Sequence, residues 1–142
     1  MKTKLNLLFL LCFVLFACED APDLSRTSWK LTGIFHNGKK HPPVPDCDNC
    51  YILKFTGWDK LEATASASTF SGTYTISAST LKITTLESTT PDMEDVEDGI
   101  LFVDALKSAG AFEIKGGSLI LYFGKKNHLI FSEYSDKKND IN

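Results

Sequence analysis

The chain has 142 residues, of which 43% are hydrophobic, and a formal net charge of −3 at pH 7. A chain of this length can bury a hydrophobic core and most simply forms one domain. Its mild acidity, without a basic stripe along the sequence, argues against nucleic acid as a partner.

The first 17 residues have the composition of an export signal. Lys2 and Lys4 give a basic start without acidic residues, and residues 5–16 are apolar except for Asn6. This stretch is shorter than the about 20 residues that a helix needs to cross a bilayer, which favours a cleaved signal. Removal of residues 1–17 would leave 13 of the 15 basic residues and all 18 acidic residues, a net charge of −5.

The end of this signal resembles the lipobox of bacterial lipoproteins. Leu15 stands three positions before the expected mature residue, Ala17 directly before it, and Cys18 follows. The resemblance implies a diacylglycerol on Cys18, and two or more acyl chains anchor a protein stably. The alternative is an ordinary secretory signal with an incidental cysteine. Acidic residues 19–20 resemble the export signal of surface-exposed lipoproteins in the Bacteroidetes, so we expect a lipid-anchored protein on the outer membrane or cell surface.

The mature chain begins with polar residues 18–26, including Pro22, which predict a flexible tether. Polar residues 135–142 predict a disordered tail. Between them, residues 27–134 form one expected domain, in which apolar residues recur with the period of two that strands with one buried face show. Three prolines within residues 41–45 exclude regular structure there, because proline lacks the N–H donor. The expected strands before residue 90 are 27–33, 51–55, 61–67, 69–77 and 80–85.

The period then changes and predicts one α-helix at about residues 91–108. Thr90 suits the N-cap position, and Pro91 suits the first helical position. Gly110 is the expected stop signal. Apolar residues at spacings of three and four would form one buried stripe, made of Met93, Val96, Ile100, Val103 and Leu106.

Alternation resumes after the helix, with turn signals at residues 36–40 and 124–127 and a two-residue hairpin signal at 116–117. The expected later strands are 111–115, 118–123 and 128–134. About eight short antiparallel strands and one helix predict a mainly β (α+β) fold. The sheet would curl into a barrel or half-barrel, with the helix inserted after the fifth strand.

Several of these short segments occur in an order typical of one protein family. They are Trp29 and Leu31, residues 51–55, Ser71 to Ile76, Leu81 to Ile83, Glu97 and Leu106 in the helix, and the closing segments 112–114, 119–122 and 129–131. This ordered set resembles the META domain, the HslJ-like heat-shock protein family, and more loosely a lipocalin. The resemblance implies a β domain and carries no established enzyme chemistry. The family's usual Gly-Cys-Asn segment is replaced here by residues 65–70.

Cys47 and Cys50 form the sharpest local motif of the mature chain. An exported chain lies outside the reducing cytosol, which favours a structural disulfide between them. A redox-active pair is the second interpretation, although such pairs gain low thiol pKa values at helix N-termini and this one precedes a strand. The third interpretation is a zinc site that His36 or His41 would complete.

A run of carboxylates occupies the start of the expected helix. Negative charge is favourable at that end of the helix dipole, and the spacing is not that of an EF-hand loop. We therefore expect a solvated helix face and no metal, with a divalent cation as the alternative. The residues are Asp92, Glu94, Asp95, Glu97 and Asp98.

Aromatic residues on the expected strands have two possible uses. They could fill the barrel as a core or line a cavity for one small apolar ligand. Trp58 lies in an expected turn and could contact a partner. The strand aromatics are Trp29, Phe55, Phe70, Tyr74, Phe112, Phe123 and Phe131.

The sequence offers little for catalysis. Its histidines are His36, His41 and His128, no Ser or Cys stands in a nucleophile-elbow motif, and no phosphate-binding glycine loop precedes the helix. We expect no enzyme activity and no cofactor. The leading hypothesis is a non-enzymatic envelope lipoprotein that acts as a binding or envelope-maintenance module, with the membrane as its partner through Cys18. The alternatives are a lipocalin-like carrier of a small apolar ligand and an interaction subunit of a surface complex.

Overall fold

The computed structural model of the chain describes residues 21–41, 47–91, 93–94 and 96–135. The expected signal at 1–17 and the lipidation residue Cys18 lie outside these residues. The described elements, in chain order, are β1 (Ser28–His36), β2 (Lys39–His41), β3 (Ile52–Phe55), β4 (Lys60–Thr64), β5 (Thr69–Ser77), β6 (Thr80–Ser88), α1 (Glu97–Ser108), β7 (Ala109–Lys115), β8 (Ser118–Phe123) and β9 (Asn127–Glu133).

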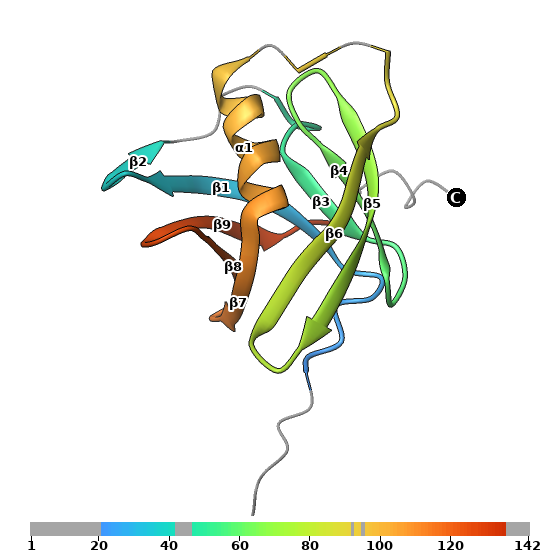
Figure 1. Ribbon diagram of the computed structural model, residues 1–142, viewed down its shortest axis with the longest axis vertical. Helices are drawn as coiled ribbons and strands as arrows, with labels where there is room; N and C mark the ends of the chain where they lie inside the picture. The colour runs from blue at the N-terminus through green and yellow to red at the C-terminus, as the bar shows by residue number, and fades with distance from the viewer. Residues whose placement is uncertain (1–20, 42–46, 92, 95, 136–142) are drawn as a thin grey trace, which may run out of the picture.

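The strands form one antiparallel sheet in the order β6-β5-β4-β3-β1-β9-β8-β7, and β2 pairs with β1. The sheet curls until its two ends approach, where Phe112 N donates to Ser79 O over 2.9 Å. Helix α1 lies across the upper part of the opening between β6 and β7 (Figure 1). The predicted mainly β, barrel-shaped fold with one helix is confirmed.

Alternating burial explains why these segments form strands. Along β8, Leu119, Leu121 and Phe123 are buried and their neighbours are more exposed. Along β1, a register shift between Leu31 and Gly33 changes which face points inward, so that Leu31 and then Ile34 are buried. Strands with this alternation place one apolar side in the barrel, and burial of each large side chain contributes about 1.5–3 kcal/mol.

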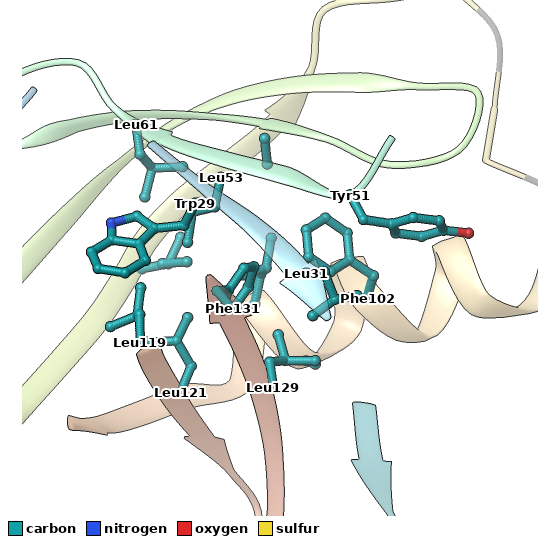
Figure 2. Packing of buried hydrophobic residues seen from close by; sticks show 14 of the residues in the cluster. Trp29, Leu31, Tyr51, Leu53, Leu61, Phe102, Leu119, Leu121, Leu129 and Phe131 are labelled. Atoms are coloured by element: carbon teal, nitrogen blue, oxygen red, sulfur yellow. The ribbon is translucent and has the colours of Figure 1, made fainter. Parts of the chain in front are cut away.

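The interior of the barrel is filled by side chains. Phe102 of α1 contacts Tyr51 edge-on, with ring centroids 5.5 Å apart, and Phe131 at 6.3 Å (Figure 2). All seven strand aromatics named from the sequence are buried, which supports the interpretation of a filled core. The other large, fully buried side chains are Phe55, Leu31, Ile34, Leu53, Leu61, Leu81, Leu106, Leu119, Leu121 and Leu129.

The predicted helix exists, but its predicted bounds of 91–108 are wrong at the start. It begins at Glu97, with Val96 at the N-cap and no side-chain cap. Thr90 is not the N-cap, because its hydroxyl accepts a hydrogen bond from Thr69 N. The buried face is Gly99, Phe102, Val103, Ala105 and Leu106. The expected stripe is therefore wrong at Met93, Val96 and Ile100, which are exposed.

Three further boundaries differ from the sequence prediction. Strand β2 was not expected, and it forms because its residues 39–41 pair back onto β1. The helix ends at Ser108 without a glycine stop, and Gly110 belongs to β7. Leu24, inside the expected tether 18–26, is 2% exposed and joins the core. Packing of the domain therefore begins before residue 27.

Candidate functional site

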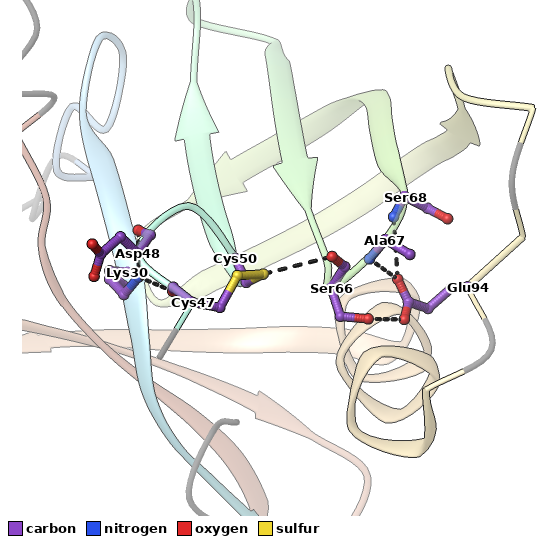
Figure 3. Close-up of a disulfide and its surroundings, with 8 residues drawn as sticks. All are labelled: Lys30, Cys47, Asp48, Cys50, Ser66, Ala67, Ser68 and Glu94. Carbon is purple, nitrogen blue, oxygen red and sulfur yellow. Dashed lines mark hydrogen bonds between the residues drawn. A yellow bond between two sulfur atoms is a disulfide. The ribbon is translucent and has the colours of Figure 1, made fainter. Parts of the chain in front are cut away.

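A carboxylate clamp connects two distant parts of the chain. Glu94, in the segment before α1, accepts hydrogen bonds from the β4–β5 turn: from the Ser66 hydroxyl, from Ala67 N at 2.9 Å and from Ser68 N at 3.3 Å (Figure 3). Hydrogen bonds to a charged carboxylate are stronger than neutral ones. The clamp therefore fixes the approach to the helix against the sheet and explains the late helix start.

The clamp favours the charged form of Glu94. Partial burial by itself would raise its pKa, but the hydrogen bonds from Ser66, Ala67, Ser68 and Val96 outweigh burial and lower the pKa below its ordinary value. Gly99 completes the arrangement, because a Cβ at that position would overlap the Glu94 carboxylate. A glycine in the first turn of α1 thus makes room for the clamp.

Cys47 and Cys50 form a disulfide, with their Cα atoms 5.3 Å apart, as the sequence predicts. Cys50 Sγ lies 3.6 Å from Ser66 O, on the same turn that holds Glu94. On the other side, Lys30 Nζ donates to Cys47 O at 2.9 Å and to Asp48 O at 2.6 Å. The disulfide loop therefore packs between β1 and the β4–β5 turn (Figure 3).

Tyr51 directly follows the disulfide and adopts a positive φ of 57°. Its side chain is buried against Phe102, and its hydroxyl makes no hydrogen bond within the described residues. Burial, followed by the negative charge of Asp98, raises the pKa of the Tyr51 hydroxyl. Tyr51 is therefore a neutral packing residue beneath the first turn of α1.

A groove of about 440 Å³ opens beside this clamp, between α1 and the ends of β5 and β6. Phe70 and Val103 supply buried apolar surface, and Met93 and Ile100, 86% and 44% exposed, supply accessible apolar surface. The lining residues are Ser68, Phe70, Ser88, Thr90, Pro91, Met93, Glu94, Ile100, Val103 and Asp104.

The chemistry of this lining suits binding. Its volume is in the range of small-molecule sites, which are mostly apolar with a few polar groups. Among the described residues, the lining contains two carboxylates, Glu94 and Asp104, and neither a basic residue nor a histidine or cysteine. Since Glu94 is held in the clamp, Asp104 is the other carboxylate among the described lining residues.

The expected carboxylate cluster is only partly described. Glu94 forms the clamp, Glu97 and Asp98 lie in the first turn of α1, and Asp92 and Asp95 lie outside the described residues. The part of the chain that the structure describes holds no group of three or more potential metal ligands from His, Cys, Asp and Glu.

The histidines lie away from the groove. His36 stacks on Phe123 with ring centroids 6.0 Å apart, and His128 stacks on Phe35 at 5.0 Å. His41 ends β2. The sequence predicted the disulfide but not the groove, because the walls of the groove come from three separate segments, 68–70, 88–94 and 100–104, with no shared local motif.

Within the described ranges, no helix has the length and apolar character that a membrane crossing requires.

Comparison with known proteins identifies the family from the sequence and finds the same fold in two solved structures. The family model described as META domain matches residues 22–136. A protein from Burkholderia xenovorans solved by NMR matches with a TM-score of 0.64 and 17% identity, over 80% of this chain and 85% of that chain. A crystal structure of a DUF4847 family protein from Bacteroides vulgatus matches with a TM-score of 0.60 and 16% identity, over 80% and 96%. No curated protein matches.

Proposed function

The chain belongs to the META domain family, and from this premise we propose that it is a lipid-anchored, non-enzymatic binding module of the bacterial envelope. The observation that supports the anchor is the lipobox-like sequence from Leu15 to Cys18. The observation that supports binding is the groove beside α1, which has apolar walls.

The anchor is tested by metabolic labelling with an alkyne analogue of palmitate in a bacterial host. We expect the wild-type chain to be labelled and to fractionate with membranes. Cys18→Ala should lose both properties. Cys12→Ala, which changes a cysteine inside the expected signal, is the matched control and should keep them. Equal labelling of all three chains would refute lipidation at Cys18.

The location of the anchored domain is tested by protease shaving of intact cells. A surface-exposed domain is expected to be digested, because its tether leaves it accessible outside the outer membrane. A domain that is cleaved only after the cells are broken would contradict surface exposure, while the labelling result would still stand.

The groove defines the ligand that it would accept. Its accessible walls are apolar at Met93 and Ile100, and Asp104 adds a negative charge. An apolar molecule that carries one positive charge complements both features. Because side chains fill the core of the barrel, the ligand of a carrier would occupy the groove and not the barrel interior.

Binding is tested by NMR titration with dodecyltrimethylammonium below its micelle concentration. We expect shifts at Ile100 and Val103, weaker binding by Ile100→Ser and Asp104→Asn, and little binding of dodecyl sulfate. Trp58→Ser, at an apolar residue 80% exposed outside the groove, is the control and should bind as wild type. Equal affinity for both detergents would contradict the proposal that Asp104 favours a positively charged ligand. No shift at the groove would reject a carrier and leave the interaction subunit as the better hypothesis.

A further inference from the structure

Two hairpin ends that carry lysines lie side by side at one end of the sheet. Lys39 and Lys40 begin β2 directly after the β1–β2 turn at Asn37-Gly38, and the β8–β9 turn contains Gly124-Lys125-Lys126. Asn37 N of the first turn donates to Asn127 Oδ1 of the second over 3.1 Å. We call residues 35–41 and 122–128 the lysine tip.

The lysine tip is a basic patch on an acidic chain. It holds four of the 15 Lys and Arg residues and none of the 18 Asp and Glu residues. All four lysine side chains are exposed, and no carboxylate of the described residues pairs with them. Their positive charge is therefore available to a partner.

Aromatic rings lie among these charges on the outer face of the sheet. The strand register places Lys40 opposite Phe35, Phe35 opposite His128, and His128 opposite Tyr122. The His128 ring is 5.0 Å from Phe35 and 5.8 Å from Tyr122. The Lys40 stem crosses Gly33, where a Cβ would lie 3.1 Å from Lys40 Cε. Basic side chains with apolar stems and partly buried aromatic rings are suited to a membrane interface.

We propose that the lysine tip binds the phosphate groups of an anionic membrane surface. The tip is a projecting edge formed by the ends of two hairpins (Figure 1), which matches a flat surface better than the groove or stacking platform that single-stranded nucleic acid uses. The choice of a membrane as partner rests on the proposed lipid anchor, which would hold the domain beside a bilayer, where each exposed lysine near an anionic surface adds to binding.

The position of the tip adds a geometric consequence. Strand β1 starts at Ser28, close to the expected tether, and ends at His36 in the tip. At about 3.3 Å per residue, nine residues span roughly 30 Å. If the tether and the lysine tip both bind the membrane, β1 is held near the membrane at both ends. The barrel would then keep a fixed orientation along the membrane surface instead of moving about the tether.

The test uses a chain that starts at residue 19, which lacks the leader and Cys18, so that its outcome does not depend on lipidation. Every residue of the core cluster lies between Leu24 and Phe131, so this chain keeps the whole core. Its binding is measured by co-sedimentation with vesicles of phosphatidylcholine alone and of phosphatidylcholine with phosphatidylglycerol at 3:1, in 0.1 M and 0.5 M salt.

We expect binding to the anionic vesicles only, and its loss in high salt, because the Debye length shortens from about 10 Å at 0.1 M to a few Å. The variant with Lys39→Gln, Lys40→Gln, Lys125→Gln and Lys126→Gln should bind at least tenfold more weakly, since each basic residue near the surface contributes about fivefold. The control replaces four exposed lysines elsewhere by Gln, at Lys60, Lys82, Lys107 and Lys115, so that it has the same net charge as the tip variant. It should bind the anionic vesicles within about twofold of wild type.

Three outcomes would overturn the proposal. They are no binding to anionic vesicles, equal losses in the tip variant and the control, and tip-dependent binding to double-stranded DNA at the same phosphate concentration without binding to vesicles. The last outcome would identify a nucleic acid as the partner. Circular dichroism of both variants establishes that they are folded.

Discussion

The groove beside α1 and the lysine tip belong to one barrel but are held together differently. The groove depends on long-range contacts, in which Glu94 bonds to residues 26–28 positions away and the disulfide loop packs on the same turn. The tip is joined by the pairing of β1 with β9 and by the hydrogen bond between Asn37 and Asn127, and neither of these uses a lysine side chain. Substitutions in the groove should therefore change the stability of the fold. Substitutions of the tip lysines should change the charge of the tip with little effect on stability.

The largest expected effect is on the groove side, at Phe102. Phe102→Ala removes a fully buried ring that packs on Tyr51 and Phe131, so the free energy of unfolding should fall by about 3–5 kcal/mol. Chemical denaturation measures this change. Ile100→Ala on the same helix, at an exposed position, should cost less than about 1 kcal/mol. Equal losses for the two variants would mean that α1 does not depend on this contact.

The disulfide is the next test of the groove side. Replacement of Cys47 and Cys50 by serine should lower the free energy of unfolding by about 2 kcal/mol, because the loop-closure entropy for so small a ring is modest. A reducing agent should destabilise the wild-type chain by a similar amount and leave the double variant unchanged. Binding of anionic vesicles should remain, since none of the hydrogen bonds and ring contacts of the tip among the described residues involves this loop.

Glu94→Gln should cost about 1 kcal/mol at pH 7, because charge-assisted hydrogen bonds are lost at a partly exposed site. The folded-state pKa of Glu94 lies below its ordinary value of 4.5. The stability that it contributes is therefore present above pH 4.5 and lost as the pH falls through the lowered pKa. The variant should lose less stability than wild type between pH 5 and 3 in denaturation experiments. Parallel pH profiles would contradict a charged clamp.

The smallest effect is expected at the tip. The four-lysine variant described above should change the free energy of unfolding by less than about 0.5 kcal/mol, as surface substitutions without specific partners do. Denaturation of this variant beside Glu94→Gln compares the two regions directly. If the tip variant lost more than about 1 kcal/mol of its free energy of unfolding, the tip would contribute to stability as the groove side does, and the comparison between the two regions would be wrong.

The sequence predicted the barrel because alternation is a local signal that each strand carries. It missed β2, since Lys39-Lys40-His41 has no apolar residue and is a strand only by pairing with Ile34 to His36. It placed the helix start too early, because the cap signals at Thr90 and Pro91 are local and the clamp on Glu94 is not. A contact between residues far apart in sequence overrode the local preference.

The two sites differ in the same way. Nothing in the sequence around Glu94, Ile100 or Asp104 indicates a groove, because its other wall comes from Ser68 in the β4–β5 turn and Phe70 on β5. The lysine tip leaves a visible trace, since Gly-Lys-Lys occurs in two turns. The pairing of β9 with β1 brings these two lysine pairs together into one patch, and that pairing is not visible in the local sequence.

The same pairing has a consequence during synthesis. Strand β1 is made first among the strands, but its central partner β9 ends at Glu133, near the end of the chain. The sheet therefore cannot form completely until the chain up to Glu133 has left the ribosome, and pairing over such a separation is intrinsically slow. A chain truncated before β9 would leave β1 with an open edge, a form that favours aggregation.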